Sequence, residues 1–555
     1  MTLPAAALRD PVQQPMPAAS GRPEQPRRWA TPATLRTLRW TVFIAAFTAT
    51  VLQLTLLFTT ANLATSALIV AGNALGYGYA LRQSTLQRYP ISTLMLLGYT
   101  FSYFTLPPLG QLLGLQPVTH HLYFPVIDLA YAVIGLLALI GGHQLYSNGS
   151  LLIALRGILR KQFYGRLGFY RVPHFSQLWL MGAIGVIAVL FGDHFDVRGS
   201  GILQAVMQGL HPFVYVPYIT LLLPAWSPPR RIPRVNGLAL VFYTGALLVL
   251  AMIVNSRAYL LMGFASLLIV YFFLLATGQM PLPNVSPRKI ALAAFAILLI
   301  AGPVSEMAMA MVLVRGERTD MTPSQLVLKT WETFRSGHIA QRFARISAAM
   351  AGGRGINEDY FDNLYLNRLA NLKFVDNAVD NQQALGPGAA SYFAQIEKQK
   401  VISILPSPMI SLLGLDANKR LVTSGSSGDF LLYAVSGDPY AIGGFRSGSL
   451  LVNLDIVFGY LWPLLLLLLS ALIFAVVDAW CWAGPAESTG EWTARFNPLV
   501  IGMLFSESFF FTSAATGTES ISGIMGVLMR GWIQIAVLYA VAFWLTRVLS
   551  VWRRS

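Results

Sequence analysis

Residues 450–477 have the sequence LLVNLDIVFGYLWPLLLLLLSALIFAVV, and this stretch decides the fold class. It contains one charged residue, Asp455, in its first third. Because a helix of roughly 20 apolar residues is long enough to cross the hydrocarbon core of a bilayer, the stretch predicts a membrane-spanning helix. Asp455 is then an acidic group near one end of a span.

The whole chain has the composition of a membrane protein. Of its 555 residues, 55% are hydrophobic and 11% are charged, and the mean hydropathy is +0.57. A soluble domain carries about 25% charged residues, so the composition excludes a water-soluble globular protein. The single cysteine, Cys481, allows no internal disulfide.

Twelve apolar segments predict an all-α polytopic protein with twelve transmembrane helices. Two assignments are the weakest: the first pair of segments, which are joined by a very short turn, and the sixth segment, which contains Gln204, Gln208 and His211. If either assignment is wrong, the number of spans changes between even and odd. The predicted spans are about 40–58, 61–80, 91–107, 123–142, 176–192, 204–224, 237–254, 258–277, 290–312, 450–477, 498–516 and 522–546.

The predicted spans divide the chain into five regions. Residues 1–39 form a basic tail that we expect to be disordered and to contain no cleavable signal peptide. Residues 40–312 hold the first nine spans, 313–449 form a large and mainly helical loop, 450–546 hold the last three spans, and 547–555 form a short tail. A polar segment as long as 313–449 predicts a separate domain or cap outside the membrane.

The basic residues orient these regions. The chain has 39 Lys and Arg against 24 Asp and Glu, a net charge of +15. With both termini in the cytoplasm, 22 basic residues fall on the inside and two in the short outside loops, as the positive-inside rule requires. The net charge therefore records membrane orientation and gives no support for nucleic-acid binding. The expected location is a bacterial inner membrane, with the large loop in the periplasm.

The large loop contains a helical pattern with a basic stripe. Apolar residues recur every three to five positions from Ser324 to Met350, and Gly337 lies where this stripe shifts, so one helix or two shorter ones are predicted. Two interpretations remain open: an amphipathic helix on anionic lipid headgroups, or a phosphate-binding face. The basic stripe consists of Arg335, His338, Arg342 and Arg345.

Ionisable residues inside predicted spans mark function or paired structure, because a lone charge in a bilayer is costly. Four of them fall in the outer half of the membrane and predict a polar site that opens outward: Asp128, Arg257, Glu306 and Asp455. Glu507 and Arg530 lie at similar depth in the last two spans. We interpret this pair as a structural ion pair, with a catalytic role as the alternative.

The sequence gives little indication of metal or cofactor chemistry. Asp193 and Asp196 flank His194 and offer two carboxylates to a divalent cation, but no further ligands stand at motif spacing, so a solvated loop is the preferred interpretation. No phosphate loop, nucleophile elbow or dinucleotide fingerprint is present. We therefore predict no metal and no cofactor.

Two short stretches resemble the O-antigen polymerase and ligase group of membrane glycosyltransferases, which use polyprenyl-pyrophosphate glycans. The first is Asn255-Ser256-Arg257, followed by an apolar helix. The second is Gly448-Ser449 followed by Asp455-Ile456-Val457-Phe458-Gly459-Tyr460. The plan of about a dozen spans with one long periplasmic loop is also similar. The acidic position is Glu in much of the group and Asp455 here.

The resemblance favours a Wzy-like polymerase of oligosaccharide repeat units. The ligase branch has a His-Asn pair near the end of its loop, whereas this chain has only Asn453 there and its sole loop histidine is His338. The expected activity is transfer of a growing glycan from its polyprenyl-pyrophosphate carrier to a new lipid-linked repeat unit. The alternatives are a ligase that moves the glycan to another lipid or protein, and a transporter or flippase for lipid-linked glycans.

The resemblance also implies roles and partners. Asp455 and His338 are the candidate bases that would deprotonate the acceptor hydroxyl. Arginines at the headgroup plane would bind the pyrophosphate bidentately. The partners implied are the lipid-linked donor and acceptor, the bilayer, and chain-length regulator and flippase proteins. The candidate pyrophosphate and glycan ligands are Arg257, Arg368 and Arg446, with Arg342 and Arg345 behind them.

Overall fold

The computed structural model describes most of the chain outside the N-terminal tail. The described residues are 32–194, 201–223, 237–254, 258–277, 279–280, 286, 288, 306–307, 309–311, 313–314, 321–337, 359–361, 370–485, 492–503 and 520–552. They are mostly helical, as the composition predicts.

The helices of the N-terminal half follow the predicted apolar segments with shifted ends. The sixth predicted span, 204–224, is an α-helix that continues as a 3-10 helix, because Pro212 and Pro217 remove backbone donors. The elements are α1 Pro32–Leu56, α2 Thr60–Ala80, α3 Gln83–Arg88, α4 Pro90–Thr100, η3 Phe101–Thr105, α5 Leu106–Leu113, α6 Pro125–Asn148, α7 Ser150–Ile158, η4 Leu159–Tyr164, α8 Phe175–His194, α9 Gly201–Leu210, η5 His211–Leu221, α10 Gly237–Ile253 and α11 Ala258–Ala276.

The C-terminal half holds the polar helices and the last predicted spans. These elements are α13 Pro323–Arg335, α16 Leu372–Gln383, α17 Pro387–Ser403, α18 Ser407–Leu412, α19 Lys419–Thr423, α20 Ser427–Ser436, η9 Pro439–Ala441, α21 Leu450–Phe458, η10 Gly459–Leu461, α22 Trp462–Asp478, β1 Cys481–Pro485, β2 Trp492–Phe496, α23 Pro498–Met503, α25 Ile521–Gly526, η11 Val527–Gly531 and α26 Trp532–Trp552.

Within the described part of the chain, four helical stretches are long and apolar enough to cross a membrane. They are Arg36–Leu56, Pro125–Asn148, Leu450–Asp478 and Ile521–Leu549. Shorter apolar helices cover Phe175–Phe191, Gly237–Ile253 and Ser266–Ala276. These stretches fit an all-α membrane protein, and the number of twelve spans stays a prediction.

One element departs from the predicted all-α class. Strands β1 and β2 form an antiparallel hairpin in which Cys481 pairs with Phe496 and Pro485 with Trp492. Arg160 from η4 donates to the Cys481 carbonyl at 2.8 Å, and the Ala494 amide donates to Gln279. The strands are short and lie between apolar helices, so the sequence predicted only a connecting segment there.

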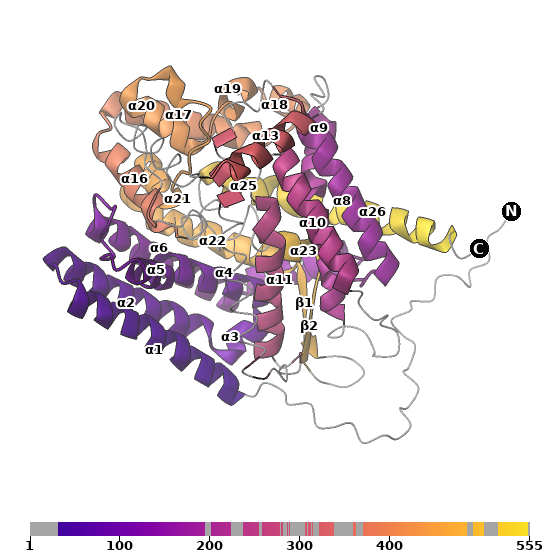
Figure 1. The fold of residues 1–555 in the computed structure, drawn as a ribbon, viewed down its shortest axis with the longest axis horizontal. Helices are drawn as coiled ribbons and strands as arrows, with labels where there is room; N and C mark the ends of the chain where they lie inside the picture. The colour runs from indigo at the N-terminus through magenta and orange to yellow at the C-terminus, as the bar shows by residue number, and fades with distance from the viewer. Residues whose placement is uncertain are drawn as a thin grey trace.

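Helices α6 and α22 form the centre of the bundle (Figure 1). Gly142 of α6 lies against the Ser470 hydroxyl and the Leu467 carbonyl of α22, and a Cβ there would overlap both. Glycine is required at this position because the two backbones approach closely, as is common between membrane helices. Helices α2 and α4 also contact α6.

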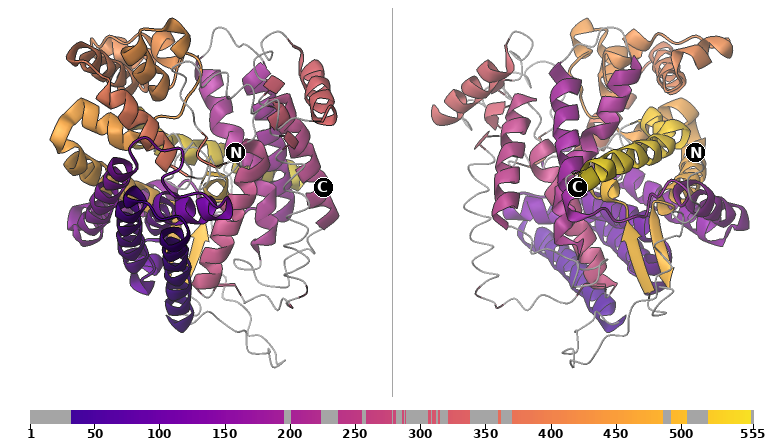
Figure 2. Two further views of the ribbon diagram at one scale, coloured as in Figure 1. Left: turned by 60° about the vertical axis from the view of Figure 1, so that its left-hand side comes forward. Right: turned by 90° about the vertical axis from the view of Figure 1, so that its right-hand side faces the viewer.

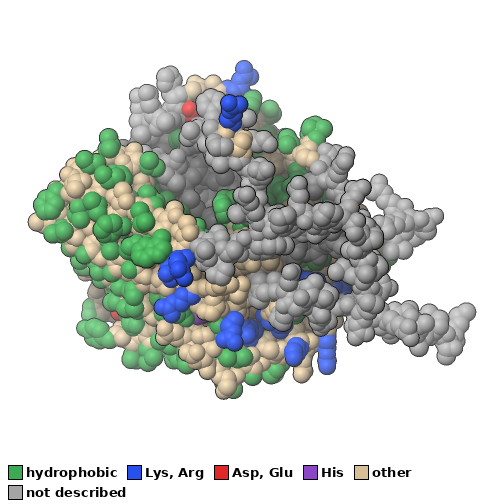
Figure 3. Space-filling view, turned by 90° about the horizontal axis from the view of Figure 1, so that it is seen from below, with side chains coloured by type: hydrophobic (Ala, Val, Ile, Leu, Met, Phe, Trp, Pro, Cys, Tyr) green, Lys and Arg blue, Asp and Glu red, His purple; other side chains and the backbone are tan. Residues whose placement is uncertain are grey.

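The polar helices α16 to α20 gather at one end of the molecule, and the hairpin lies at the opposite end (Figures 1 and 2). Seen from below, Lys and Arg side chains form a band across that opposite end (Figure 3). Arg156 belongs to this end, where it donates to the Arg88 carbonyl and the Tyr146 hydroxyl. The two ends therefore differ in character, with polar helices at one and basic side chains at the other.

A buried polar chain joins four helices near the basic end. Asp478 of α22 accepts bonds from the Ile91 and Ser92 amides and from the Ser92 hydroxyl at 2.6 Å, which satisfies the first turn of α4. His143 of α6 contacts the Ser92 hydroxyl at 3.1 Å and the Tyr79 hydroxyl at 2.8 Å. Because Ser92 gives its proton to Asp478, the His143 Nε2 carries the proton and Nδ1 accepts from Tyr79.

The polar helices have a small core of their own. Glu397 of α17 is buried and accepts a bond of 2.5 Å from the Ser427 hydroxyl of α20. Lys400, one turn further along α17, donates to the Gly425 carbonyl and to the same hydroxyl. Burial raises the pKa of Glu397 above its ordinary value, because the charged carboxylate loses its hydration.

Candidate functional site

Asp455 lies just before a break in a long apolar helix. Helix α21 ends at Phe458, and Gly459 follows with φ 55°, in the left-handed region that favours glycine. The Gly459 amide donates to the Asp455 carbonyl, and a short 3-10 turn leads into α22. The half-buried Asp455 is thus in the last full turn of a short helix rather than in the middle of a continuous span.

Two side chains from distant segments hold the Asp455 carboxylate. The Tyr131 hydroxyl of α6 donates to Oδ2 at 2.5 Å, and the Gln382 amide of α16 donates to the same oxygen at 2.6 Å. The Tyr131 ring is stacked on Trp462, with centroids 5.5 Å apart, which fixes its direction. No described residue donates to Oδ1, so one carboxylate oxygen is held and the other is available.

A buried ion pair fixes α16 on the start of α6. Lys373 Nζ lies 2.7 Å from Asp376 Oδ2 and also donates to the His121 carbonyl. Asp376 Oδ1 accepts bonds from the Tyr123 and Phe124 amides, immediately before α6 begins. Gln382 is six residues further along α16, so these contacts set its position over Asp455.

Asp128 belongs to the same buried cluster. Its side chain is completely buried in the first turn of α6, and neither carboxylate oxygen has a hydrogen-bond partner. Its electrostatic partners are Asp376 and Lys373. Two carboxyl groups and one ammonium therefore share a dry site at the joint between α6 and α16.

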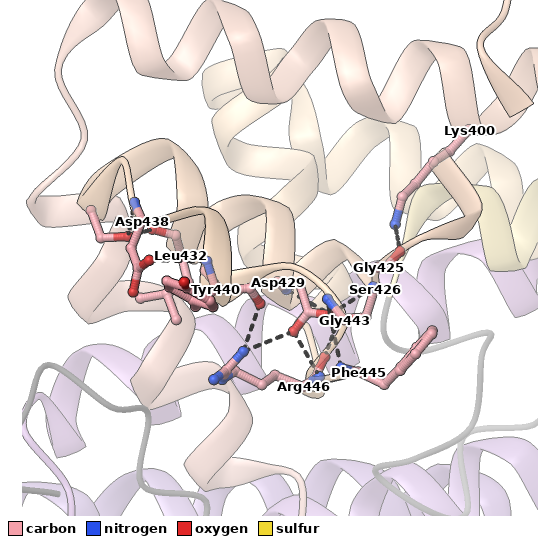
Figure 4. Close-up of polar contacts among 12 residues, drawn as sticks. Lys400, Gly425, Ser426, Asp429, Leu432, Asp438, Tyr440, Gly443, Phe445 and Arg446 are labelled. Atoms are coloured by element: carbon pink, nitrogen blue, oxygen red, sulfur yellow. Dashed lines mark hydrogen bonds and ion pairs between the residues drawn. The ribbon is translucent and has the colours of Figure 1, made fainter. Parts of the chain in front are cut away.

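Asp429 organises the glycine-rich loop that precedes α21 (Figure 4). This buried residue of α20 forms a capping box with Ser426 and accepts bonds from the Phe445 amide at 2.8 Å and the Arg446 amide at 3.1 Å. Phe445 has a positive φ of 51° and an exposed ring. The loop is thus folded around one carboxylate rather than being merely flexible.

One edge of the Arg446 guanidinium is hydrogen-bonded inside the protein. Its NH1 group donates to Asp429 Oδ1 at 3.2 Å and to the Ala441 carbonyl at 2.7 Å. A Cβ on Gly444 would overlap this NH1 group, so a side chain there would displace the guanidinium from Asp429. The side chain is 28% exposed, and its NH2 and Nε groups have no partner among the described residues. The free edge can accept an anion without breaking the contact to Asp429.

Three of the predicted site residues, Asp455, Arg446 and Arg530, lie in the described part of the chain, and no described contact joins any two of them. Asp455 and Arg446 lie on either side of the junction between the loop and α21, and no described contact joins their side chains. Arg530 is exposed on the π-helix η11. Six predicted residues lie outside the described residues: Arg257, His338, Arg342, Arg345, Arg368 and Glu507. The proposed ion pair between Glu507 and Arg530 therefore stays a prediction.

Sequence reasoning missed the residues that hold Asp455 and Arg446. Tyr131 and Gln382 carry no local signal, because a tyrosine in an apolar helix and a glutamine in a polar one are common. Asp429 had a signal, since Ser426 and Asp429 stand at capping-box spacing before an apolar run. Within the described ranges, no group of three or more His, Cys, Asp or Glu side chains is arranged to hold a metal ion.

Comparison with known proteins gives no relative: no family model matches the sequence, and no curated protein or solved structure is significantly similar to it.

Proposed function

We propose that this chain is a polysaccharide polymerase of the bacterial inner membrane. It would transfer a growing glycan from its polyprenyl-pyrophosphate carrier to a new lipid-linked repeat unit on the periplasmic side. The proposal includes the twelve spans, the cytoplasmic termini and the periplasmic loop predicted from the sequence. The observation that carries it is the half-buried Asp455, whose Oδ2 is held by Tyr131 and Gln382 while Oδ1 is available.

The proposed chemistry needs one base and one anion site. A hydroxyl of the acceptor sugar gives its proton to Asp455 Oδ1 as its oxygen attacks the anomeric carbon of the donor. The bond from that carbon to the pyrophosphate oxygen breaks, and polyprenyl pyrophosphate leaves with the bonding electrons. The two hydrogen bonds to Oδ2 orient the carboxylate, so Oδ1 can point at the acceptor.

Arg446 suits the leaving group. Its free Nε and NH2 edge matches two phosphate oxygens, and Asp429 prevents the guanidinium from rotating away. Charge on the leaving pyrophosphate grows as the bond breaks, so a fixed cation would stabilise the transition state. Arg257, Arg368, Arg342 and Arg345 are proposed as further ligands, and His338 is the alternative base.

Reconstitution with purified lipid-linked single repeat units tests the function. A ladder of multimers would support polymerisation. Elongation only after a second lipid or protein acceptor is added would indicate a ligase. Movement of the lipid-linked unit across the bilayer without elongation would indicate a transporter.

Asp455→Asn tests the site within the same assay. It keeps the size of the side chain and its contacts but removes the base, so chain growth should fall by about 100-fold or more. Asp380→Asn is the matched control, because Asp380 is an exposed carboxylate on α16 close to Gln382. Long chains made by Asp455→Asn at the normal rate would remove Asp455 from the catalytic role.

A further inference from the structure

Helix α13 lies across one end of an apolar helix. It runs from Pro323 to Arg335 and begins with a capping box between Thr322 and Gln325. It packs on α10 and lies beside the polar helices at the top of Figure 1. Ser336 caps its C-terminus and Gly337 follows with φ 69°, so the helix ends there, before most of the predicted basic stripe.

The inner face of α13 packs on a small apolar core and also buries the Thr330 hydroxyl. Leu326 is buried, and Val327 and Phe334 pack on Met252 in the last turn of α10. Met307 and Met311 complete this small core. The contact places α13 at the level where α10 ends.

Helix α10 presents an apolar surface to its surroundings. Its seventeen residues extend over about 25 Å at 1.5 Å per residue, close to the thickness of a bilayer core. Its exposed large side chains are all apolar: Leu238 at 63%, Val241 at 67%, Phe242 at 71% and Val249 at 45%. In a membrane protein such a face contacts lipid, so the end of α10 marks the edge of the hydrocarbon layer.

The outer face of α13 carries two apolar and two charged side chains, and Arg335 projects between Leu328 and Trp331. Leu328 is 61% exposed and Trp331 is 46% exposed, one turn apart. Glu332 and Arg335 are also exposed, and successive residues are turned by about 100° around a helix. Trp331 and Glu332 are adjacent in the sequence, so their side chains point in clearly different directions around the helix.

We propose that α13 is an interfacial helix that inserts Leu328 and Trp331 into the lipid headgroup layer at this end of α10. Tryptophan is enriched at this depth because its ring is amphipathic. Arg335 lies at the level of the lipid phosphates, and Glu332 faces water. The partner is the bilayer itself, and this inference is independent of the proposed enzymatic function.

Single-cysteine labelling tests this placement. In a Cys481→Ser background, Leu328→Cys, Trp331→Cys and Glu332→Cys are each labelled with a polarity-sensitive fluorophore in vesicles. Labels at 328 and 331 should show blue-shifted emission and strong quenching by nitroxides on lipid acyl chains. The label at 332 should respond mainly to an aqueous quencher. A melting temperature equal to that of the wild-type protein establishes that a variant is folded.

Two results would overturn the proposal. Equal response of all three labels to the aqueous quencher would place α13 in water. Protection of 328 and 331 from both quenchers would place them in a protein interface, such as one with a second copy of the chain. Leu328→Ser with the label at 331 provides a second variant, and it should reduce quenching by lipid nitroxides while leaving the melting temperature unchanged.

Discussion

The Tyr131 hydroxyl donates a hydrogen bond of 2.5 Å to Oδ2 of Asp455 and joins helix α6 to helix α21. Gln382 donates to the same oxygen from the polar helix α16. Three segments that are far apart in the sequence thus meet at one carboxylate. This convergence fixes the Asp455 carboxylate where apolar and polar helices meet.

Replacing Tyr131 with Phe should reduce chain growth by about tenfold. The variant keeps the ring stacked on Trp462 but removes one of two donors to Oδ2, and a hydrogen bond to a charged group contributes about 1.5–3 kcal/mol. The rate of polymer formation by purified protein is the measurement. Tyr440→Phe is the control, because the Tyr440 side chain lies in the loop after α20 and is 91% exposed. An unchanged rate in Tyr131→Phe would show that Gln382 alone orients the carboxylate.

Removing the Asp429 carboxylate should unfold the loop before α21. Asp429→Ala leaves the Phe445 and Arg446 amides without their acceptor and leaves the Arg446 guanidinium half-buried without a counter-charge. Breaking a buried ion pair costs about 3–5 kcal/mol, and the partial exposure of Arg446 reduces this to about 2 kcal/mol. Thermal unfolding in detergent measures the loss.

Asp438→Ala is the matched control for the loop. Asp438 is an exposed carboxylate in the same segment that accepts a single amide bond, from Tyr440. Its replacement should lower the melting temperature much less. Equal melting temperatures for the two variants would contradict the role assigned to Asp429.

Glu397 should make stability depend on pH. Burial raises the pKa of this carboxyl in the folded protein, so the folded state prefers the protonated form. The stability contributed by Glu397 is fully present below its unfolded pKa of about 4.5 and is lost as pH rises through the folded pKa. The side chain of Glu397→Gln stays neutral at every pH. As pH rises from 4.5, the melting temperature of this variant should therefore increase relative to that of the wild type. Glu332→Gln, at an exposed position, should show no such trend, and a constant difference for Glu397→Gln at all pH values would refute the assignment.

The two buried acids at the joint between α6 and α16, Asp128 and Asp376, should differ in their response to amide substitution. Asp376→Asn removes the counter-charge of the buried Lys373, at a cost of about 3–5 kcal/mol. Asp128→Asn removes a buried carboxyl that has no hydrogen-bond partner, so the melting temperature should not fall. Differential scanning fluorimetry of both variants gives the comparison. A large loss of stability in Asp128→Asn would mean that its carboxyl stabilises the cluster.

Much of the helical structure could be predicted because hydropathy is a local property. A span must satisfy its backbone internally and present apolar side chains to lipid, so its position is visible in any window of the sequence. The predicted segments at 61–80 and 237–254 therefore match α2 and α10 within a few residues. The hairpin at Cys481 was missed because its pairing depends on two strands that meet only in three dimensions.

The sequence by itself determined the apolar character of the chain and the position of Asp455 at the start of a long apolar stretch, and it predicted a basic excess on one side of a membrane. Only the tertiary structure decided which side chains meet at Asp455. Tyr131 is 324 positions away from it and Gln382 is 73 positions away. Helices that are apolar on every side carry no periodic signal that specifies their neighbours, so their polar partners are fixed by packing alone.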